Sequence, residues 1–424
     1  MYGSMGGIGI ANLAGSFIAF LATPVLSRLY SPEQLGLYFY TVTLASLVSI
    51  CISGQLFYGI QTSRNIRLSR RIYAESIYVV VAGALVLLAS LTIGAIASRP
   101  FPLLQFDLAP LIWAVLYGSL LAWVQIRALM LIRLKEWRKY TGSTLARPIA
   151  IAAVQLSLPL VAGHTSPGGL LIGASVGELA SLAIGGFFNT RELSPWAGKR
   201  IWVRFYSWRY SGLLRFFLPS QLMNIGANAL PSIVLKSTGE AFLLGAFGLL
   251  LRIFQVPLSA LSDGIRGVYW ISIQNMRKRQ LHLTLANALA ALFLTAVVAL
   301  GYLASGLNLV AAFAGPSWQG IDAYVPFIVF WCGTSLAVAF PVEILKHTGR
   351  LRRLFWSDAL ASLLKTLAVF IAAWSPSVDI VIAFCSVAGC CNLFNLTNHM
   401  RAIHATSKSQ HLAFAHPVDQ WSQP

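Results

Sequence analysis

The sequence predicts an all-α polytopic membrane protein with about twelve transmembrane helices in two six-helix lobes. Hydrophobic residues make up 57% of the 424-residue chain and charged residues only 10%, whereas a soluble domain carries roughly 25% charged residues. Twelve apolar runs are long enough to span a membrane. The polar segments between these runs are alternately rich and poor in Lys and Arg, which is typical of a polytopic membrane protein.

The apolar runs give the expected helices in order. A spanning helix needs about 20 mostly apolar residues. We expect helices at residues 7–27, 35–58, 76–97, 110–131, 143–163, 168–188, 213–235, 241–263, 284–304, 322–345, 355–374 and 378–400. An even number of spans places both termini on the same side of the membrane.

The basic segments indicate which side that is. They lie around residues 64–71, 133–139, 191–215, 266–279 and 346–353 and in the C-terminal tail, and they hold most of the 31 Lys and Arg residues. Because positively charged loops stay in the cytoplasm, we expect a multi-pass protein of the bacterial inner membrane with both termini cytoplasmic. The net charge of +18 then reflects these loops and their contact with anionic lipids, not a nucleic-acid partner.

The longest polar break divides the chain into two halves. We expect an N-terminal lobe at 1–189, a cytoplasmic linker at 190–212, a C-terminal lobe at 213–403 and a cytoplasmic tail at 404–424. Basic and aromatic residues alternate in the linker, which suits an interfacial segment on anionic headgroups. Six helices per lobe give both lobes the same orientation, which implies a pseudo-two-fold axis along the membrane normal.

One face of the helix expected at 241–263 is polar. Arg252, Gln255, Ser259 and Asp263 recur at steps of three or four residues. Arg252 falls near mid-membrane, where a charge is costly, and its planar fork of donors suits phosphate. The stripe therefore predicts a cavity wall that binds an anionic headgroup. The alternative is an arginine paired with an acid on a neighbouring helix for structure.

Two further helices carry similar stripes. Gln221, Asn224 and Asn228 share one face of the helix expected at 213–235, and Asn12 and Ser16 share one face of the first helix. We interpret both stripes as walls of the same cavity. The alternative is hydrogen bonding between helices, which contributes only about 0.6 kcal/mol per contact.

Carboxylates within the apolar runs are candidates for ion coupling. Glu178 lies beside a ridge of small residues at every fourth position from 169 to 185, a pattern that predicts close helix packing. Glu178 either carries a coupling proton or cation or pairs with a membrane Arg or Lys. Asp358 shares a face with Lys365. Either Lys365 binds the substrate's phosphate in the cavity and Asp358 couples an ion, or the two charges only compensate each other. Asp263 is the third candidate.

The sequence supports neither an enzyme nor a cofactor. The five cysteines lie in apolar runs without metal-ligand spacing to His, as packing residues do. The chain has no Walker-type phosphate loop, HisGluxxHis motif or nucleophile elbow, and its loops are too short for a catalytic domain.

Several sequence patches resemble a known family. Residues 23–40 read TPVLSRLYSPEQLGLYFY, and LPSQLMN (218–224), LLGAFGLLLRIFQVPLS (243–259), FAGPSW (313–318) and KHTGR (346–350) follow in the second half. These patches resemble the polysaccharide (O-antigen or exopolysaccharide) flippase family of the multidrug/oligosaccharidyl-lipid/polysaccharide exporter superfamily. The resemblance implies two lobes around a cavity and alternating-access translocation of undecaprenyl-pyrophosphate-linked oligosaccharide across the inner membrane.

The first patch matches the family motif at Arg28, Pro32, Glu33 and Gly36. We interpret these residues as gate or fold elements, with Pro32 and Gly36 in a tight turn and Arg28 paired with Glu33 at the outer face. The partners implied by the resemblance are the lipid-linked oligosaccharide and, in the same pathway, polysaccharide polymerase and chain-length proteins.

Three other functions compete with this reading. A multidrug antiporter of the same superfamily would be expected to have an acidic, apolar and aromatic cavity, whereas the mid-membrane charges here are mainly basic. A membrane glycan polymerase or ligase would place Arg- and His-rich loops outside, where this chain has short loops poor in both. A scaffold protein would not need polar stripes facing a cavity.

Overall fold

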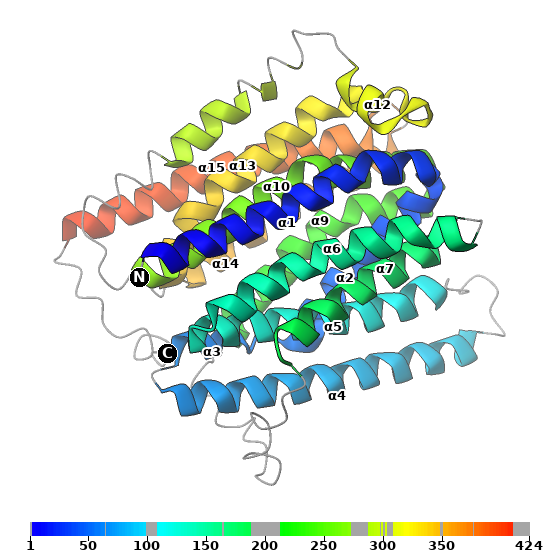
Figure 1. Cartoon of the computed structure of the whole chain (residues 1–424). Helices are drawn as coiled ribbons and strands as arrows, with labels where there is room; N and C mark the ends of the chain where they lie inside the picture. The colour runs from blue at the N-terminus through cyan, green and yellow to red at the C-terminus, as the bar shows by residue number, and fades with distance from the viewer. Residues whose placement is uncertain are drawn as a thin grey trace.

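The computed structural model describes residues 2–63, 65–98, 108–162, 165–187, 213–272, 287–296, 298–299, 302, 308–347, 351–375 and 377–409. All of its described elements are helices (Figure 1). Ten described helices are long and apolar enough to cross a membrane. The all-α, polytopic fold class with two lobes is therefore confirmed.

The N-terminal lobe contains six long helices and one short one. They are α1 (Tyr2–Leu29), α2 (Pro32–Ser53), α3 (Tyr58–Thr62), α4 (Ile66–Ser98), α5 (Leu108–Leu134), α6 (Trp137–Ala162) and α7 (Pro167–Ile184). The closest pair is α6 and α7, because Gly173 and Gly177 bring α7 against the side chains of Gln155 and Ile151. The small-residue ridge thus packs against α6.

The C-terminal lobe begins with a π-helical turn, η4 (Leu213–Phe217). It continues with α9 (Leu218–Ser237), α10 (Ala241–Ser272), a helix at Asn287–Ala296, α12 (Leu309–Ala314), η6 (Pro316–Trp318), η7 (Ile321–Tyr324), α13 (Val325–His347), α14 (Leu351–Trp374) and α15 (Ile380–Ser409). The expected linker at 190–212, and the tail from 410, lie outside the described residues.

Several expected helices are longer in the structure, and the third differs most. The run at 76–97 belongs to α4, which begins ten residues earlier at Ile66. Its first turns carry Arg67, Arg70 and Arg71, so apolar length alone missed a basic helical extension before the apolar run. At the same end of the bundle, Arg133 donates to the carbonyl of Ser63 (2.6 Å) and joins the α5–α6 connection to the start of α4.

The SerProGluGln stretch before α2 forms a helix N-cap instead of a free turn. Ser31 Oγ accepts from the backbone of Gln34 (3.4 Å), and Gln34 Oε1 accepts from the backbone of Ser31 (3.1 Å). Pro32 occupies the first turn, where its missing N–H costs no hydrogen bond. Gly36 lies inside the helix, against Gly245 of α10. The expected pairing of Arg28 with Glu33 is not among the described ion pairs.

The two lobes meet at the end of the bundle farthest from the N-terminus. There the end of α1 contacts the α12–η6 segment (Figure 1). Ser27 Oγ donates to the carbonyl of Ala314 (2.9 Å), and Trp318 Nε1 donates to the carbonyl of Ser27 (2.9 Å). The Phe20 and Phe313 rings stack at 5.3 Å, and Arg28 reaches the carbonyl of Ala312 at 3.5 Å. We call this set of contacts the outer seal, because it lies at the end of the bundle that the expected topology places outside.

Close packing of α2 on α10 continues the outer seal. A side chain at Gly245 would collide with the carbonyl of Pro32, and one at Gly248 with the Phe39 ring. Glycine at these positions lets the two helices approach with their backbones nearly in contact. The lobes are therefore joined at this end by both hydrogen bonds and steric fit.

We predict that Gly245→Ala weakens the outer seal, because the added methyl cannot fit against the rigid backbone of Pro32. A cysteine introduced at Ser16 should then react several-fold faster with a membrane-impermeant maleimide added on the sealed side. Gly226→Ala is the matched control, since its added methyl meets no atom within 4 Å. Equal labelling rates in the two variants would show that this contact does not hold the seal.

Candidate functional site

A central, partly open cavity lies between the lobes, between the outer seal and the start of α1. Its volume is about 640 Å³. On α1 it is lined by Asn12, Ser16 and Ala19, whereas Ser27 lies in the seal. Ser16 and Ser27 are eleven positions apart, which corresponds to about 16 Å along a helix. The cavity therefore occupies the half of the bundle nearer the start of α1.

Polar side chains from both lobes face this cavity. They are Asn12, Ser16, Tyr38, Thr43, Tyr117, Gln125, Tyr140, Ser143, Thr144, Arg147, Ser181, Ser232, Arg252, Gln255 and Ser259. The N-terminal lobe supplies most of them, from α1, α2, α5, α6 and α7. Because hydroxyl and amide groups both donate and accept hydrogen bonds, such a wall can bind a ligand rich in hydroxyl groups.

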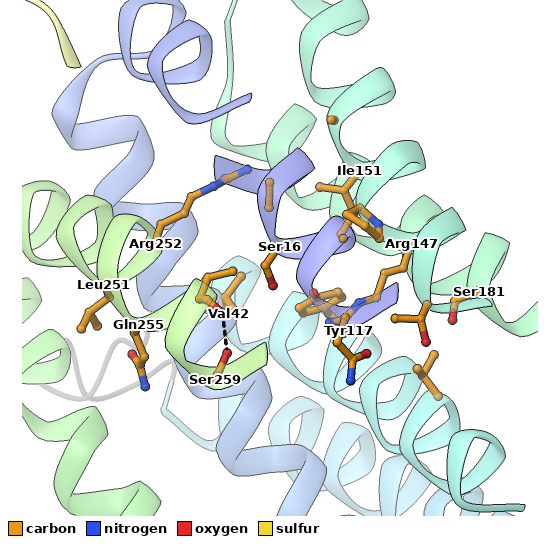
Figure 2. A pocket seen from close by; sticks show the side chains of 18 of the residues that line it. Ser16, Val42, Tyr117, Arg147, Ile151, Ser181, Leu251, Arg252, Gln255 and Ser259 are labelled. Atoms are coloured by element: carbon orange, nitrogen blue, oxygen red, sulfur yellow. Dashed lines mark hydrogen bonds between the residues drawn. The ribbon is translucent and has the colours of Figure 1, made fainter. Parts of the chain in front are cut away.

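Two arginines are the charged residues among the described lining residues. Arg252 extends from α10 and Arg147 from α6, on opposite sides of the pocket (Figure 2). Arg252 has no carboxylate partner within the described part of the chain. An arginine keeps its charge at any physiological pH. The cavity thus presents a positive charge that no described carboxylate compensates.

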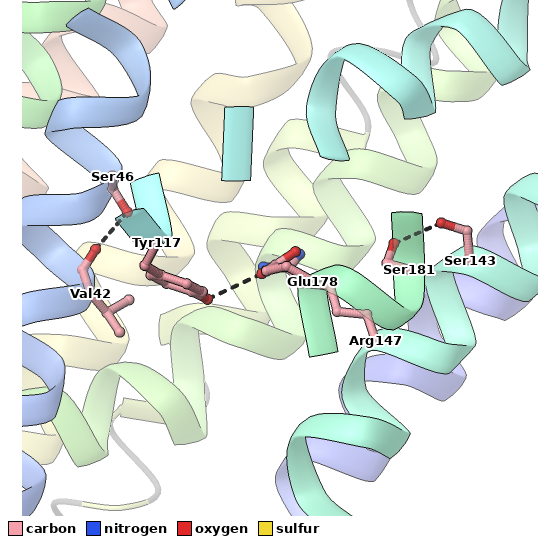
Figure 3. A network of polar contacts seen from close by, with 7 residues as sticks. All are labelled: Val42, Ser46, Tyr117, Ser143, Arg147, Glu178 and Ser181. Atoms are coloured by element: carbon pink, nitrogen blue, oxygen red, sulfur yellow. Dashed lines mark hydrogen bonds and ion pairs between the residues drawn. The ribbon is translucent and has the colours of Figure 1, made fainter. Parts of the chain in front are cut away.

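Arg147 is held differently, in a polar cluster with Tyr117 and Glu178 (Figure 3). Its Nη2 lies 2.5 Å from Oε1 of Glu178 on α7, and the Tyr117 hydroxyl donates to the same oxygen (3.1 Å). The Glu178 side chain is completely buried, whereas 39% of the Arg147 side chain is exposed. The carboxylate is therefore hidden, whereas Arg147 contacts it and also exposes part of its side chain to the cavity.

The local sequence explains how this cluster is positioned. Gly177 precedes Glu178, and its missing side chain lets α7 lie directly on the carbonyl of Arg147. Pro148 follows Arg147 and has no N–H for the carbonyl of Thr144, one turn earlier. Gly15 of α1 packs on the Pro148 ring. Close helix packing on both sides thus fixes the base of the Arg147 side chain.

The residues expected to form the cavity fall into two groups. Asn12, Ser16, Arg252, Gln255 and Ser259 line it, as their stripes predicted. Gln221, Asn224, Asn228 and Lys365 are not among its lining residues. On α9 the residue that reaches the cavity is Ser232, one turn beyond Asn228.

Asn224 and Asn228 bind Lys365 instead. Lys365 Nζ donates to both of their amide oxygens at 3.1 Å, and the lysine is 3% exposed. An ammonium group is costly to bury unless its donors are satisfied. The polar stripe on α9 therefore solvates a charge on α14 inside the C-terminal lobe.

Two of the three carboxylates expected to couple ions have described partners. Asp358 accepts a short hydrogen bond from Ser220 between α14 and α9. Asp263 lies in α10, but its side chain is outside the described part of the chain. Glu178 is the one candidate whose described partner, Arg147, lines the cavity.

Arg147, Tyr117 and the serine pair Ser143–Ser181 are site residues that were not predicted from the sequence. Ser143 and Ser181 are 2.7 Å apart and tie α6 to α7 beside the ion pair. Arg147 is a charge inside an apolar run, and that signal could have identified it. Its partner could not be identified from sequence, because the register of α6 against α7 depends on how the glycine ridge packs.

We predict that Asn224→Ala destabilises the protein by about 1–3 kcal/mol, because it removes an acceptor from a buried ammonium. The apparent melting temperature of the purified protein should fall by several degrees. In a Lys365→Met background the same change should cost much less, since the charge is gone. An equal loss in both backgrounds would show that Asn224 does not solvate Lys365.

Comparisons with known proteins show the fold only. No protein-family model and no curated sequence matches the chain. An inward-facing multidrug resistance MATE family transporter of the MOP superfamily matches with a TM-score of 0.58 and 11% identity, over 95% of this chain and 100% of that chain. A mutant of the Vibrio cholerae MATE transporter VcmN gives 0.56 and 11%, over 97% and 98%.

A third structure, from Pyrococcus furiosus, gives a TM-score of 0.50 and 11% identity over 96% of both chains. It is described as a MOP superfamily transporter in which reverse polarity of the binding pocket suggests a different function. At these identities the likeness establishes architecture. The chain has the two-lobed fold of the MATE family transporters.

Proposed function

We propose that this protein is a transporter that moves an anionic, lipid-linked oligosaccharide across the inner membrane by alternating access. The undecaprenyl-pyrophosphate-linked repeat unit of a polysaccharide is the substrate we favour. The observation that carries this proposal is the positive central cavity, where Arg252 and Arg147 face each other across the lobe interface.

The charge of the cavity suits a diphosphate group. Guanidinium groups bind phosphate oxygens through paired, charge-assisted hydrogen bonds. Those bonds are stronger in a low-dielectric site than in water. A diphosphate placed here would compensate Arg252, which has no carboxylate partner among the described residues.

The size and polarity of the cavity suit the sugars next to the diphosphate. The volume of about 640 Å³ lies within the range of roughly 300–1,000 Å³ typical of small-molecule sites. It would hold a headgroup and its first sugars, with the rest of the glycan extending through the open side. Asn12, Ser16 and Gln255 supply donors and acceptors for the hydroxyl groups.

The fold supports the conformational change that transport needs. The cavity lies between two lobes that are joined at one end by the outer seal. If the lobes rocked so that this seal opened and the other end closed, the cavity would face the opposite side of the membrane. The substrate would then be released without a continuous pore.

The second candidate function is multidrug export, which the likeness to multidrug resistance MATE transporters favours. A cavity built for lipophilic cations would need uncompensated negative charge. In this chain Glu178 is buried and paired, and the exposed charges of the described lining are arginines. Reversed pocket polarity has been linked to a different function in the Pyrococcus furiosus transporter, and the same logic favours an anionic substrate here.

The test uses cells that lack the gene and a membrane-impermeant label for the glycan. Complete lipid-linked units should accumulate on the cytoplasmic leaflet, and the wild-type gene should return them to the outer leaflet. If lipid-linked glycan on the outer leaflet is labelled normally in cells without the gene, flipping by this protein is excluded and multidrug export is favoured.

We predict that Arg252→Ala reduces this complementation at least tenfold at equal protein levels in the membrane, because the cavity loses its uncompensated charge. Arg71→Ala is the matched control, since Arg71 pairs with Glu75 on α4 and does not line the cavity. Full complementation by Arg252→Ala would remove this residue as the phosphate anchor.

A further inference from the structure

The Arg147–Glu178 pair places a hidden carboxylate in competition with any anion that enters the cavity. Arg147 is shared between the two, because its charged end contacts Glu178 while part of its side chain lines the cavity. Glu178 cannot follow Arg147 into the cavity, since its side chain is fully buried between α6, α7 and α5. A ligand anion that binds Arg147 must therefore weaken the ion pair.

The surroundings of Glu178 decide what happens to its charge. Of the helices packed against α7, α6 contributes Arg147 and α5 contributes the Tyr117 hydroxyl. The titratable group that α2 contributes is Tyr38, which lines the same cavity. No second cation faces Glu178 within the described residues, and its Oε2 is buried without a hydrogen-bond partner.

A carboxylate left in this environment would be poorly stabilised. Removing one partner from a buried ion pair leaves an uncompensated charge at low dielectric, which is strongly unfavourable. Such a group becomes neutral by taking up a proton. A protonated Glu178 keeps its contact with Tyr117, because the carbonyl oxygen of a carboxylic acid still accepts a hydrogen bond.

We propose that the anionic headgroup displaces Glu178 from Arg147 and that Glu178 takes up one proton from water as the ion pair opens. This exchange rests on the proposed function, because it takes the substrate to be an anion. The one covalent change is a proton transfer: an O–H bond forms on Glu178 as the O–H bond of a hydronium ion in solution breaks. Release of the anion reverses both steps, since Glu178 loses the proton and recaptures Arg147.

This exchange gives Glu178 a role in release. Two uncompensated arginines would bind a diphosphate tightly and give it up slowly. A carboxylate that recaptures Arg147 lowers the affinity and returns the cavity to its starting state. It also makes affinity depend on pH: binding that takes up a proton weakens as pH rises, by up to about tenfold per pH unit.

The experiment measures binding of farnesyl diphosphate to the purified full-length protein by calorimetry at pH 6, 7 and 8. Two buffers with different ionisation enthalpies give the number of protons taken up at each pH. The probe changes its own protonation, so the quantity compared is the difference between wild type and Glu178→Gln. The glutamine keeps the shape and a hydrogen-bonding oxygen for Tyr117 but cannot titrate.

We expect wild type to take up about one proton more than Glu178→Gln at pH 8. Glu178→Gln should bind about tenfold more tightly there, and its advantage should shrink toward pH 6 as protonation becomes easier in wild type. Glu75→Gln, which removes a paired carboxylate outside the cavity, should match wild type at every pH.

Equal proton uptake and a pH-independent affinity ratio would overturn the exchange but leave an anionic substrate intact, provided that Arg252→Ala still weakens binding. No binding of the probe to either protein would overturn the proposed function and the exchange together.

If Glu178→Gln does not elute as a monodisperse protein, Tyr117→Phe replaces it. Loss of that donor destabilises the charged carboxylate, so proton uptake should persist to higher pH than in wild type, and unchanged uptake would overturn the exchange.

Discussion

The cost of placing charge in a low-dielectric interior organises the functional part of this structure. Three of the cations in the described spanning helices meet that cost in different ways. Lys365 is surrounded by two amide oxygens, Arg147 is paired with a buried carboxylate, and Arg252 faces the central cavity. These three solutions divide the cations into one that is structural, one that is shared and one that is available to a ligand.

Close helix packing makes this arrangement possible. The glycines of α7 bring it onto α6, so that Glu178 is shielded from water while Arg147 is not. At the other end of the bundle, Gly36 and Gly245 bring α2 onto α10 and close the outer seal. Small residues thus set both the electrostatic environment of the site and the side from which it opens. The proposed transport follows from those two properties together.

The fold could be predicted from sequence because the membrane requires long apolar helices, and their lengths and separations are visible in the chain. The stripe containing Arg252, Gln255 and Ser259 could be predicted because its polar residues recur with helical periodicity. The direction of the Asn224–Asn228 stripe could not, since one polar face suits a cavity and a buried lysine equally well. The partner of Glu178 also depends on helix register, which a single sequence does not reveal.

The most direct test of an anion-selective cavity is whether the protein prefers an anionic or a cationic ligand. Purified protein would be titrated in parallel with an anionic lipid analogue, geranylgeranyl diphosphate, and with the lipophilic cation tetraphenylphosphonium. We expect measurable binding of the diphosphate that weakens at high salt, as paired charges require, and much weaker binding of the cation. Tighter binding of the cation, unaffected by the diphosphate, would contradict a cavity selective for anions and would favour multidrug export.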